Sequence, residues 1–109
     1  MKNRVEKISQ ILDTHKAESI EAFDLSRQDY FVDEVIIASS LGVRHTEALL
    51  DHLKKELKPH EQFLGVEVSD EWIVIDLGDI LIHIMTPEYR IKYDMESFLN
   101  SLMTSSNNN

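Results

Sequence analysis

The chain has 109 residues, of which 42% are hydrophobic, and its 20 acidic residues outnumber 11 lysines and arginines, for a net charge of -9. This length and apolar content suit one compact domain with a single modest core. The acidic charge, without any basic stripe, argues against direct dependence on nucleic acid and favours a basic protein surface as partner. The absence of cysteine excludes disulfides, thiol catalysis and thiolate metal sites.

Membrane and secretory segments are not evident in the sequence. No apolar region follows the N-terminal charges, and no apolar run approaches the roughly 20 residues that span a bilayer. We therefore expect a cytoplasmic protein that makes no membrane contact.

The first half of the chain predicts a helix followed by two strands. Apolar residues recur at helical spacing over residues 3–16, which indicates an amphipathic helix. A short strand is expected over 20–25 and a polar turn over 26–30. Residues 33–39 contain Val-Ile-Ile-Ala without alternation, a pattern typical of a strand that is buried on both faces near the centre of a sheet.

A second helix and a third strand follow. The helix is predicted over residues 43–58, where Pro59 ends it. Residues 63–68 alternate between apolar and other side chains and predict a strand. The apolar stripe of the helix is Leu49, Leu50, Leu53 and Leu57.

The last helix begins at Thr86-Pro87-Glu88, which places a threonine cap, a proline at the first helical position and an acid in the first turn. The expected buried face of this helix is Ile91, Met95, Phe98 and Leu102.

Residues 104–109 are all Ser, Thr or Asn and are expected to form a disordered tail, so a single domain covers residues 1–103.

The stretch over residues 72–85 predicts a β-hairpin around which the sheet is built. Gly78-Asp79 separates two β-branched runs, and a glycine at the first central position suits a type II′ turn with a positive φ. Leu77 then faces Ile80, and strict alternation assigns every other side chain to a face. One face is wholly aliphatic and is expected to be core: Ile73, Ile75, Leu77, Ile80, Ile82 and Ile84. The other face is mixed, with Trp72 opposite Met85, Val74 opposite His83, and Asp76 opposite Leu81.

The predicted order of elements is therefore α-β-β-α-β-β-β-α. Strands joined partly by a helix and partly by hairpins are typical of a mixed β-sheet with flanking helices, an α/β (α+β) fold.

The mixed face of the hairpin is the expected binding site. Trp72 is either core or an interface anchor, and Asp76 either caps the turn or contacts a partner. Asp79 occupies a position where the turn favours a polar residue. Between Pro59 and Tyr89 there are seven acids and no lysine or arginine, which suits a basic protein partner. Such an exposed face is also expected to form a homodimer when the partner is absent.

Five histidines raise the alternative of a metal site. His45 and His52 are seven residues apart on one predicted helix, about 10 Å along its axis, which is too far for a shared ion bound at about 2 Å per ligand. Solvated helix histidines are the favoured interpretation, with His83 as a packed or hydrogen-bonded residue. We therefore predict no metal and no other cofactor.

Three segments resemble the Iojap-like ribosomal silencing factors. They are residues 31–38 (Phe-Val-Asp-Glu-Val-Ile-Ile-Ala), 44–49 (Arg-His-Thr-Glu-Ala-Leu) and 72–83 (Trp-Ile-Val-Ile-Asp-Leu-Gly-Asp-Ile-Leu-Ile-His). Arg90 and Tyr93 also fall where the family pattern has these residue types, and the resemblance covers residues 5 to 102.

The resemblance implies a regulatory protein that is not an enzyme, with a nucleotidyltransferase-like fold. Such factors bind a basic large-subunit ribosomal protein at the intersubunit face and prevent the small subunit from joining, which represses translation when nutrients are short. The partner-binding residues expected here are Trp72, Asp76, Leu77, Gly78, Asp79, Leu81, Met85 and Tyr93.

The alternative function is a nucleotidyltransferase-like enzyme. That chemistry needs paired carboxylates on a strand that follows a Gly-Ser turn, so that they hold a metal on the triphosphate. The only Asp-x-Glu is Asp94-Met95-Glu96, inside a predicted helix, and Ser39-Ser40 lacks the glycine that a close phosphate approach favours. No catalytic residue is therefore assigned.

Overall fold

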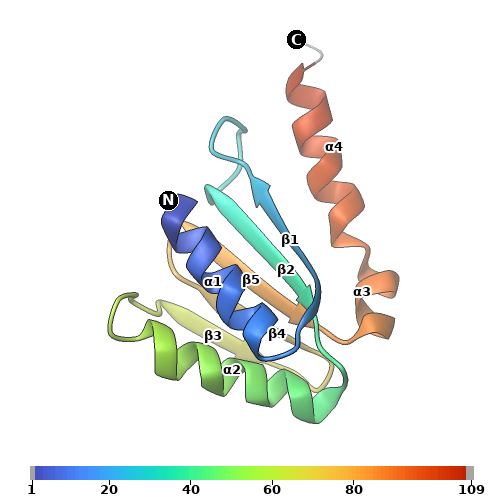
Figure 1. The fold of residues 1–109 in the computed structure, drawn as a ribbon. Coiled ribbons are helices and arrows are strands. Elements are labelled where there is room, and N and C mark those ends of the chain that lie inside the picture. Colours follow the sequence, from blue (N-terminus) through green and yellow to red (C-terminus); the bar gives the residue numbers. More distant parts are fainter. Residues whose placement is uncertain (1, 108–109) are drawn as a thin grey trace.

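A computed structural model describes residues 2–107 as four helices and a five-stranded mixed sheet (Figure 1). The strand order is β1-β2-β5-β4-β3, with β2 and β5 parallel and the other neighbours antiparallel. The predicted fold class is confirmed. In chain order the elements are α1 (Lys2–Thr14), β1 (Glu18–Asp24), β2 (Glu34–Ser39), α2 (Val43–Leu57), β3 (Gly65–Val68), β4 (Trp72–Asp76), β5 (Ile80–Met85), α3 (Pro87–Tyr93) and α4 (Met95–Asn107).

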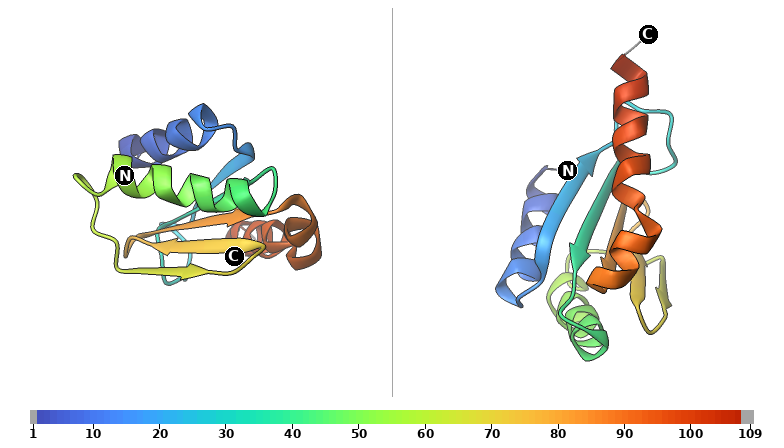
Figure 2. Two further views of the ribbon diagram at one scale, coloured as in Figure 1. Left: turned by 90° about the horizontal axis from the view of Figure 1, so that it is seen from below. Right: turned by 90° about the vertical axis from the view of Figure 1, so that its right-hand side faces the viewer.

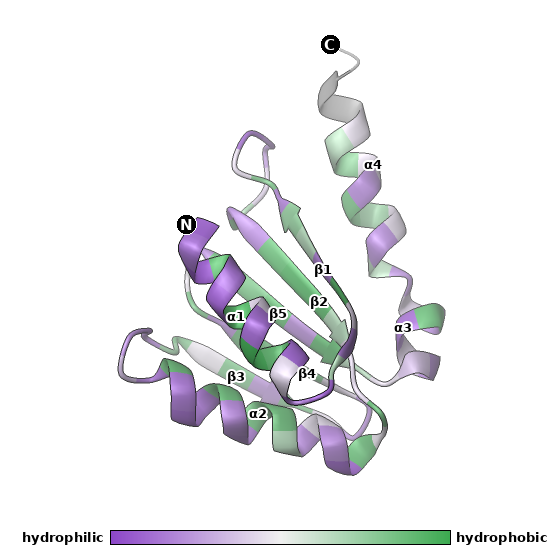
Figure 3. Cartoon of the chain, viewed as in Figure 1, coloured by the Kyte–Doolittle hydropathy of each residue, from purple (hydrophilic) through white to green (hydrophobic). Residues whose placement is uncertain are grey.

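The sheet has a hydrophobic core on each face. The helices α1 and α2 cover one face, and α3 and α4 lie on the other (Figure 2). In β2, Ile36 belongs to the first core and Ile37 to the second, so this strand is buried on both sides as its sequence predicts. Hydrophobic residues accordingly run along the middle of the sheet, while α1 and α2 alternate between hydrophobic and hydrophilic positions (Figure 3). None of the helices described over residues 2–107 has the length and apolar composition needed to cross a membrane.

The hairpin has the predicted register. Trp72 pairs with Met85, Val74 with His83, and Asp76 with Leu81. The Leu77 N–H donates to the Ile80 carbonyl at 2.9 Å, which closes the two-residue loop. Gly78 has a φ of 96°, the positive value that the turn requires at its first central position.

The prediction of one last helix is wrong, because Asp94 divides it into α3 and α4. Asp94 adopts the left-handed conformation (φ 49°, ψ 49°), which changes the direction of the chain and the phase of the helical faces. Ile91 and Phe98, expected to be buried, are 81% and 51% exposed, whereas Leu99 is fully buried in the second core. Met95 and Leu102 pack partly against that core, as predicted.

Arg90 is buried in α3, one turn before the break. Its guanidinium donates to the Ser19 carbonyl at 2.6 Å, the Ser39 hydroxyl at 3.0 Å and the Glu21 carboxylate at 2.8 Å. The side chain of a charged residue therefore faces the sheet where an apolar helix face was expected. The helix α4 continues to Asn107, past the expected start of the tail at residue 104; residues 108–109 lie outside the described range, so disorder of the tail stays a prediction.

Candidate partner-binding face

The second face of the sheet is covered unevenly. Every residue of β2 is buried, but β3 and β4 keep accessible side chains on the side of α3 and α4. Glu67 is exposed, and Trp72, Val74 and Asp76 are half-buried. The part of the sheet formed by β3 and β4 thus offers a surface that the chain itself does not fill.

An aromatic cavity of about 180 Å³ lies on this surface. The indole of Trp72 and the ring of Tyr89 have centroids 6.4 Å apart, and Tyr89 stacks on Tyr93 at 5.6 Å. Both tyrosines come from α3, one helical turn apart and therefore on the same side of it. We call this surface the aromatic face and define it by the residues that line the cavity: Glu67, Trp72, Val74, His83, Met85, Tyr89 and Tyr93.

The histidine of the aromatic face is neutral at physiological pH. Burial lowers the pKa of His83 from 6.5 to about 4. Its Nε2 is buried and has no hydrogen-bond partner within the described part of the chain. A buried polar atom without a hydrogen-bond partner is energetically unfavourable.

Acidic residues lie at the cavity and next to it in the sequence. Glu67 lines it, and the exposed residues Asp70 and Glu71 precede Trp72 in the turn between β3 and β4. Within residues 2–107, no lysine or arginine lines the cavity. A partner with basic side chains next to an apolar group would match this arrangement of aromatic rings and acids.

The structure brings together some of the residues expected at the site. Trp72, Met85 and Tyr93 line one cavity, although Met85 is only 2% exposed and forms its floor. Leu81 is 7% exposed and packs in the second core. The expectation that the mixed face of the hairpin is exposed is therefore wrong for Leu81 and Met85, which pack in the same core as Leu99 of α4.

The other expected residues lie at the tip of the hairpin. Leu77 is buried in the core beneath α1 and α2, on the opposite face. The Asp76 carboxylate accepts a hydrogen bond from the Gly78 N–H at 2.8 Å, so it caps the turn. Asp79 forms an ion pair with Arg4 of α1. A role of these tip residues in binding stays a prediction.

Tyr89 is the residue of the aromatic face that the sequence analysis missed. The signal was present, because the Thr86-Pro87 cap fixes where α3 begins and so places Tyr89 on the same side as Tyr93. The cap is formed by the Thr86 hydroxyl, which accepts from the Tyr89 N–H at 3.4 Å.

The sequence favoured solvated histidines on α2, but His45 and His52 both contact other residues. His45 is half-buried, with its Nδ1 accepting from the Leu41 N–H at 2.8 Å and its Nε2 2.7 Å from the His15 carbonyl. The ring of His52 stacks on that of His15 with centroids 3.5 Å apart. Both residues therefore contribute to the contact between α1 and α2.

Comparisons with known proteins agree with the resemblance seen in the sequence. The model of the family described as "Ribosomal silencing factor during starvation" matches residues 1–108. A ribosomal silencing factor of Haemophilus influenzae is 34% identical over 96 residues, which cover 84% of this chain and 93% of the relative. A mouse protein named "Mitochondrial assembly of ribosomal large subunit protein 1" is 26% identical over 99 residues, covering 84% of this chain and 43% of its own length.

Solved structures share the fold. A Chromobacterium violaceum protein superimposes with a TM-score of 0.82 at 27% identity, covering 90% of this chain and 85% of its own. A Bacillus halodurans protein does so with a TM-score of 0.79 at 22% identity, covering 90% and 94%, a likeness of fold alone. With a family model that spans the described residues, the chain belongs to the RsfS family of ribosomal silencing factors.

Proposed function

We propose that this protein represses translation in the cytoplasm under nutrient limitation by binding a basic protein of the large ribosomal subunit at the intersubunit face. The aromatic face is the binding surface, and the bound domain then blocks the small subunit sterically. The observation that carries this proposal is the accessible cavity between Trp72 and the tyrosines of α3, which is lined by Glu67 and, within residues 2–107, by no lysine or arginine.

Aromatic side chains give this surface the means to bind a protein. Trp and Tyr dominate binding energy at interfaces because they bury a large area with few rotatable bonds. Trp72 is half-buried in the free protein, so its position is already fixed before binding and less entropy is lost. The name of the mouse relative refers to assembly of the large subunit, which supports the same partner for this chain.

Steric block of subunit joining requires no catalytic group. The Asp-x-Glu sequence that the enzyme alternative needs is used elsewhere, since the Ser97 hydroxyl donates to Asp94 at 2.8 Å and Arg90 Nε lies 3.2 Å from Glu96. It lies at the junction of α3 and α4 and not on a strand. The proposal therefore includes no reaction, no cofactor and no direct dependence on nucleic acid; in the free protein, the aromatic face would pair with a second copy.

Sedimentation with purified ribosomal subunits tests the proposal. We expect the protein to sediment with large subunits and not with small ones, and to reduce the fraction of joined ribosomes when the two subunits are mixed. Equal binding to both subunits, binding to neither, or binding without any effect on joining would contradict it.

A further inference from the structure

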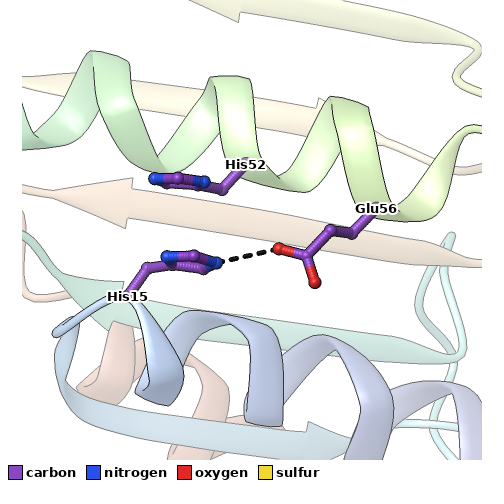
Figure 4. A group of neighbouring side chains, drawn as sticks. All are labelled: His15, His52 and Glu56. Atoms are coloured by element: carbon purple, nitrogen blue, oxygen red, sulfur yellow. Dashed lines mark hydrogen bonds and ion pairs between the residues drawn. The ribbon is translucent and has the colours of Figure 1, made fainter.

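Three side chains suited to metal binding converge between α1 and α2, on the side of the sheet opposite the aromatic face (Figure 4). They are His15, His52 and Glu56, and one ligand atom from each lies within 4.8 Å of the other two. The His15 Nε2 is 2.8 Å from a Glu56 carboxylate oxygen, and the two imidazole rings stack with an angle of 7° between their planes. This cluster plays no part in the proposed function.

The backbone of His15 is fixed by the end of α1. His15 is the C-cap of a Schellman motif, in which the Ala17 N–H donates to the Leu12 carbonyl at 2.9 Å and the Lys16 N–H to the Asp13 carbonyl at 3.0 Å. Lys16 has the positive φ of 71° that this motif needs. His15 is therefore held at one place, directly beside α2.

A second contact ties His15 to α2. His45 Nδ1 accepts from the Leu41 N–H, so the proton of a neutral His45 is on Nε2, which donates to the His15 carbonyl at 2.7 Å. His52 and Glu56 are four residues apart on the rigid α2 helix and thus on one side of it. Within residues 2–107, the His52 ring makes no hydrogen bond, which leaves its nitrogens available to a ligand.

The three ligands have the chemistry of a zinc-type ion. Imidazole and carboxylate together select Zn²⁺ and its neighbours over Mg²⁺ or Ca²⁺, which prefer oxygen ligands alone. Two histidines and one glutamate, with water in the fourth position, form an established Zn²⁺ ligand set. Bonds of about 2.1 Å in a tetrahedron place ligand atoms roughly 3.4 Å apart. Because a ring nitrogen binds a metal in the plane of its ring, completing the site requires the two stacked imidazoles to rotate relative to each other, together with shifts of roughly 1 Å that bring the ligand atoms closer.

We propose that His15, His52 and Glu56 bind one divalent transition-metal ion of the Zn²⁺ type and so join the end of α1 to α2. Glu56 is exposed and both histidines are half-buried, so the ion can enter from solvent and keep a water ligand. The ion would act as a cross-link between two helices that cover the same core.

Calorimetric titration of the full chain with Zn²⁺, after chelator treatment, tests the site. We expect one ion per chain, together with a raised melting temperature, because binding to the folded state alone stabilises it. In His52→Gln and Glu56→Gln, the dissociation constant should rise at least about tenfold, since loss of even an outer-shell partner of a metal ligand weakens binding by 10–100-fold. The matched controls are His60→Gln and Asp51→Asn, which remove an exposed histidine and an exposed carboxylate outside the cluster.

The controls should bind Zn²⁺ as the unmodified chain does. Absence of saturable binding up to about 1 mM Zn²⁺, or affinity that is unchanged in both cluster variants, would overturn the proposal. So would equal losses in the cluster variants and the controls, which would show adventitious binding only. If His52→Gln does not fold, the exposed Glu56→Gln decides the question alone.

Discussion

The Arg4 guanidinium binds the Asp79 carboxylate with both of its terminal nitrogens, Nη1 at 2.7 Å from Oδ2 and Nη2 at 2.9 Å from Oδ1. The same guanidinium also binds Glu61 through Nε and Nη2, at 2.9 and 2.8 Å. Arg4 thus joins α1 to the hairpin tip and to the segment after α2. These hydrogen bonds, Glu61's above all, raise the pKa of Arg4, and the bonds from Arg4 lower the pKa of Asp79.

We expect Asp79→Asn to lower the free energy of unfolding at neutral pH by about 1 kcal/mol or less, because the two side chains are 34% and 39% exposed and solvent screens the pair. A lowered carboxyl pKa stabilises the fold above the unfolded-state value, about 3.9, and this stability is lost as pH falls through the folded-state value. The difference between variant and unmodified chain should therefore shrink as pH falls below about 3.9, and disappear once the carboxyl is protonated in the folded state as well. Urea unfolding at neutral and acidic pH measures it, with the exposed Asp70→Asn as control; a difference that persists in acid would contradict this origin.

Glu34 should impose the opposite pH dependence. Burial, with smaller contributions from the charges of Asp24 and Asp33, raises the pKa of this carboxyl from 4.5 to about 7, and its Oε2 has no hydrogen-bond partner among the described residues. Between these values the folded state keeps a proton that the unfolded state has lost, so stability falls as pH rises. As pH rises from about 5 to about 8, we expect the free energy of unfolding of Glu34→Gln to increase by roughly 1–3 kcal/mol relative to that of the unmodified chain. Thermal melts at both pH values check this, and a parallel pH dependence of the two proteins would refute it.

Gly78→Ala should destabilise the protein by about 1 kcal/mol or more, since the residue has a positive φ and an added Cβ would approach the Leu64 Cδ1 to 3.1 Å. Gly65→Ala is the matched control, because its Cβ would meet only the Asp76 Cβ at 4.0 Å. Denaturant midpoints measure both. Equal midpoints for the two variants would show that the turn does not depend on this backbone conformation.

Trp72→Ala should weaken binding to large ribosomal subunits by at least about 2 kcal/mol, roughly 30-fold, while the free protein stays folded. The side chain is half-buried, so its removal should destabilise the fold by less than the 3–5 kcal/mol typical of a fully buried tryptophan. Phe31→Ala, which removes an aromatic ring that is 72% exposed, is the control. A collapsed melting temperature would assign Trp72 to the core, and intact binding with an intact fold would remove the aromatic face from the site.

Association with the large subunit should slow as salt increases, because Glu67 and its acidic neighbours attract a basic surface over a distance that ions screen. Stopped-flow or surface-binding kinetics at low and moderate salt measure the on-rate, and Glu67→Gln should reduce both the rate and its dependence on salt. An on-rate independent of salt would contradict electrostatic attraction between the two surfaces.

Features set by neighbouring residues could be predicted from the sequence. The Gly78-Asp79 pair fixes the turn, and alternation then determines every cross-strand pair of the hairpin. The two-sided burial of β2 follows likewise from its unbroken apolar run.

Features that depend on distant residues could not be predicted in this way. The break at Asp94 lies one turn after Arg90, whose hydrogen bonds go to Ser19 and Ser39. The Asp79 carboxylate accepts a hydrogen bond from Arg4 in the first turn of α1. At the site, Trp72 was found from its place on the mixed face and Tyr93 from the family resemblance, but the burial of Leu81 and Met85 depends on the core that they form with residues distant in sequence. Tyr89 could have been found as well, because the Thr86-Pro87 cap sets the start of the helix that carries it together with Tyr93.

The central position of β5 has a consequence for synthesis of the chain. This strand pairs with β2 on one side and β4 on the other, yet it is the last strand to be made. A nascent chain that ends before Ile80 holds β2 and β4 without the strand that joins them, and its unpaired strand edges are prone to aggregation. The sheet can therefore form completely only after residue 85 has left the exit tunnel of the ribosome, when the four other strands have already been synthesised.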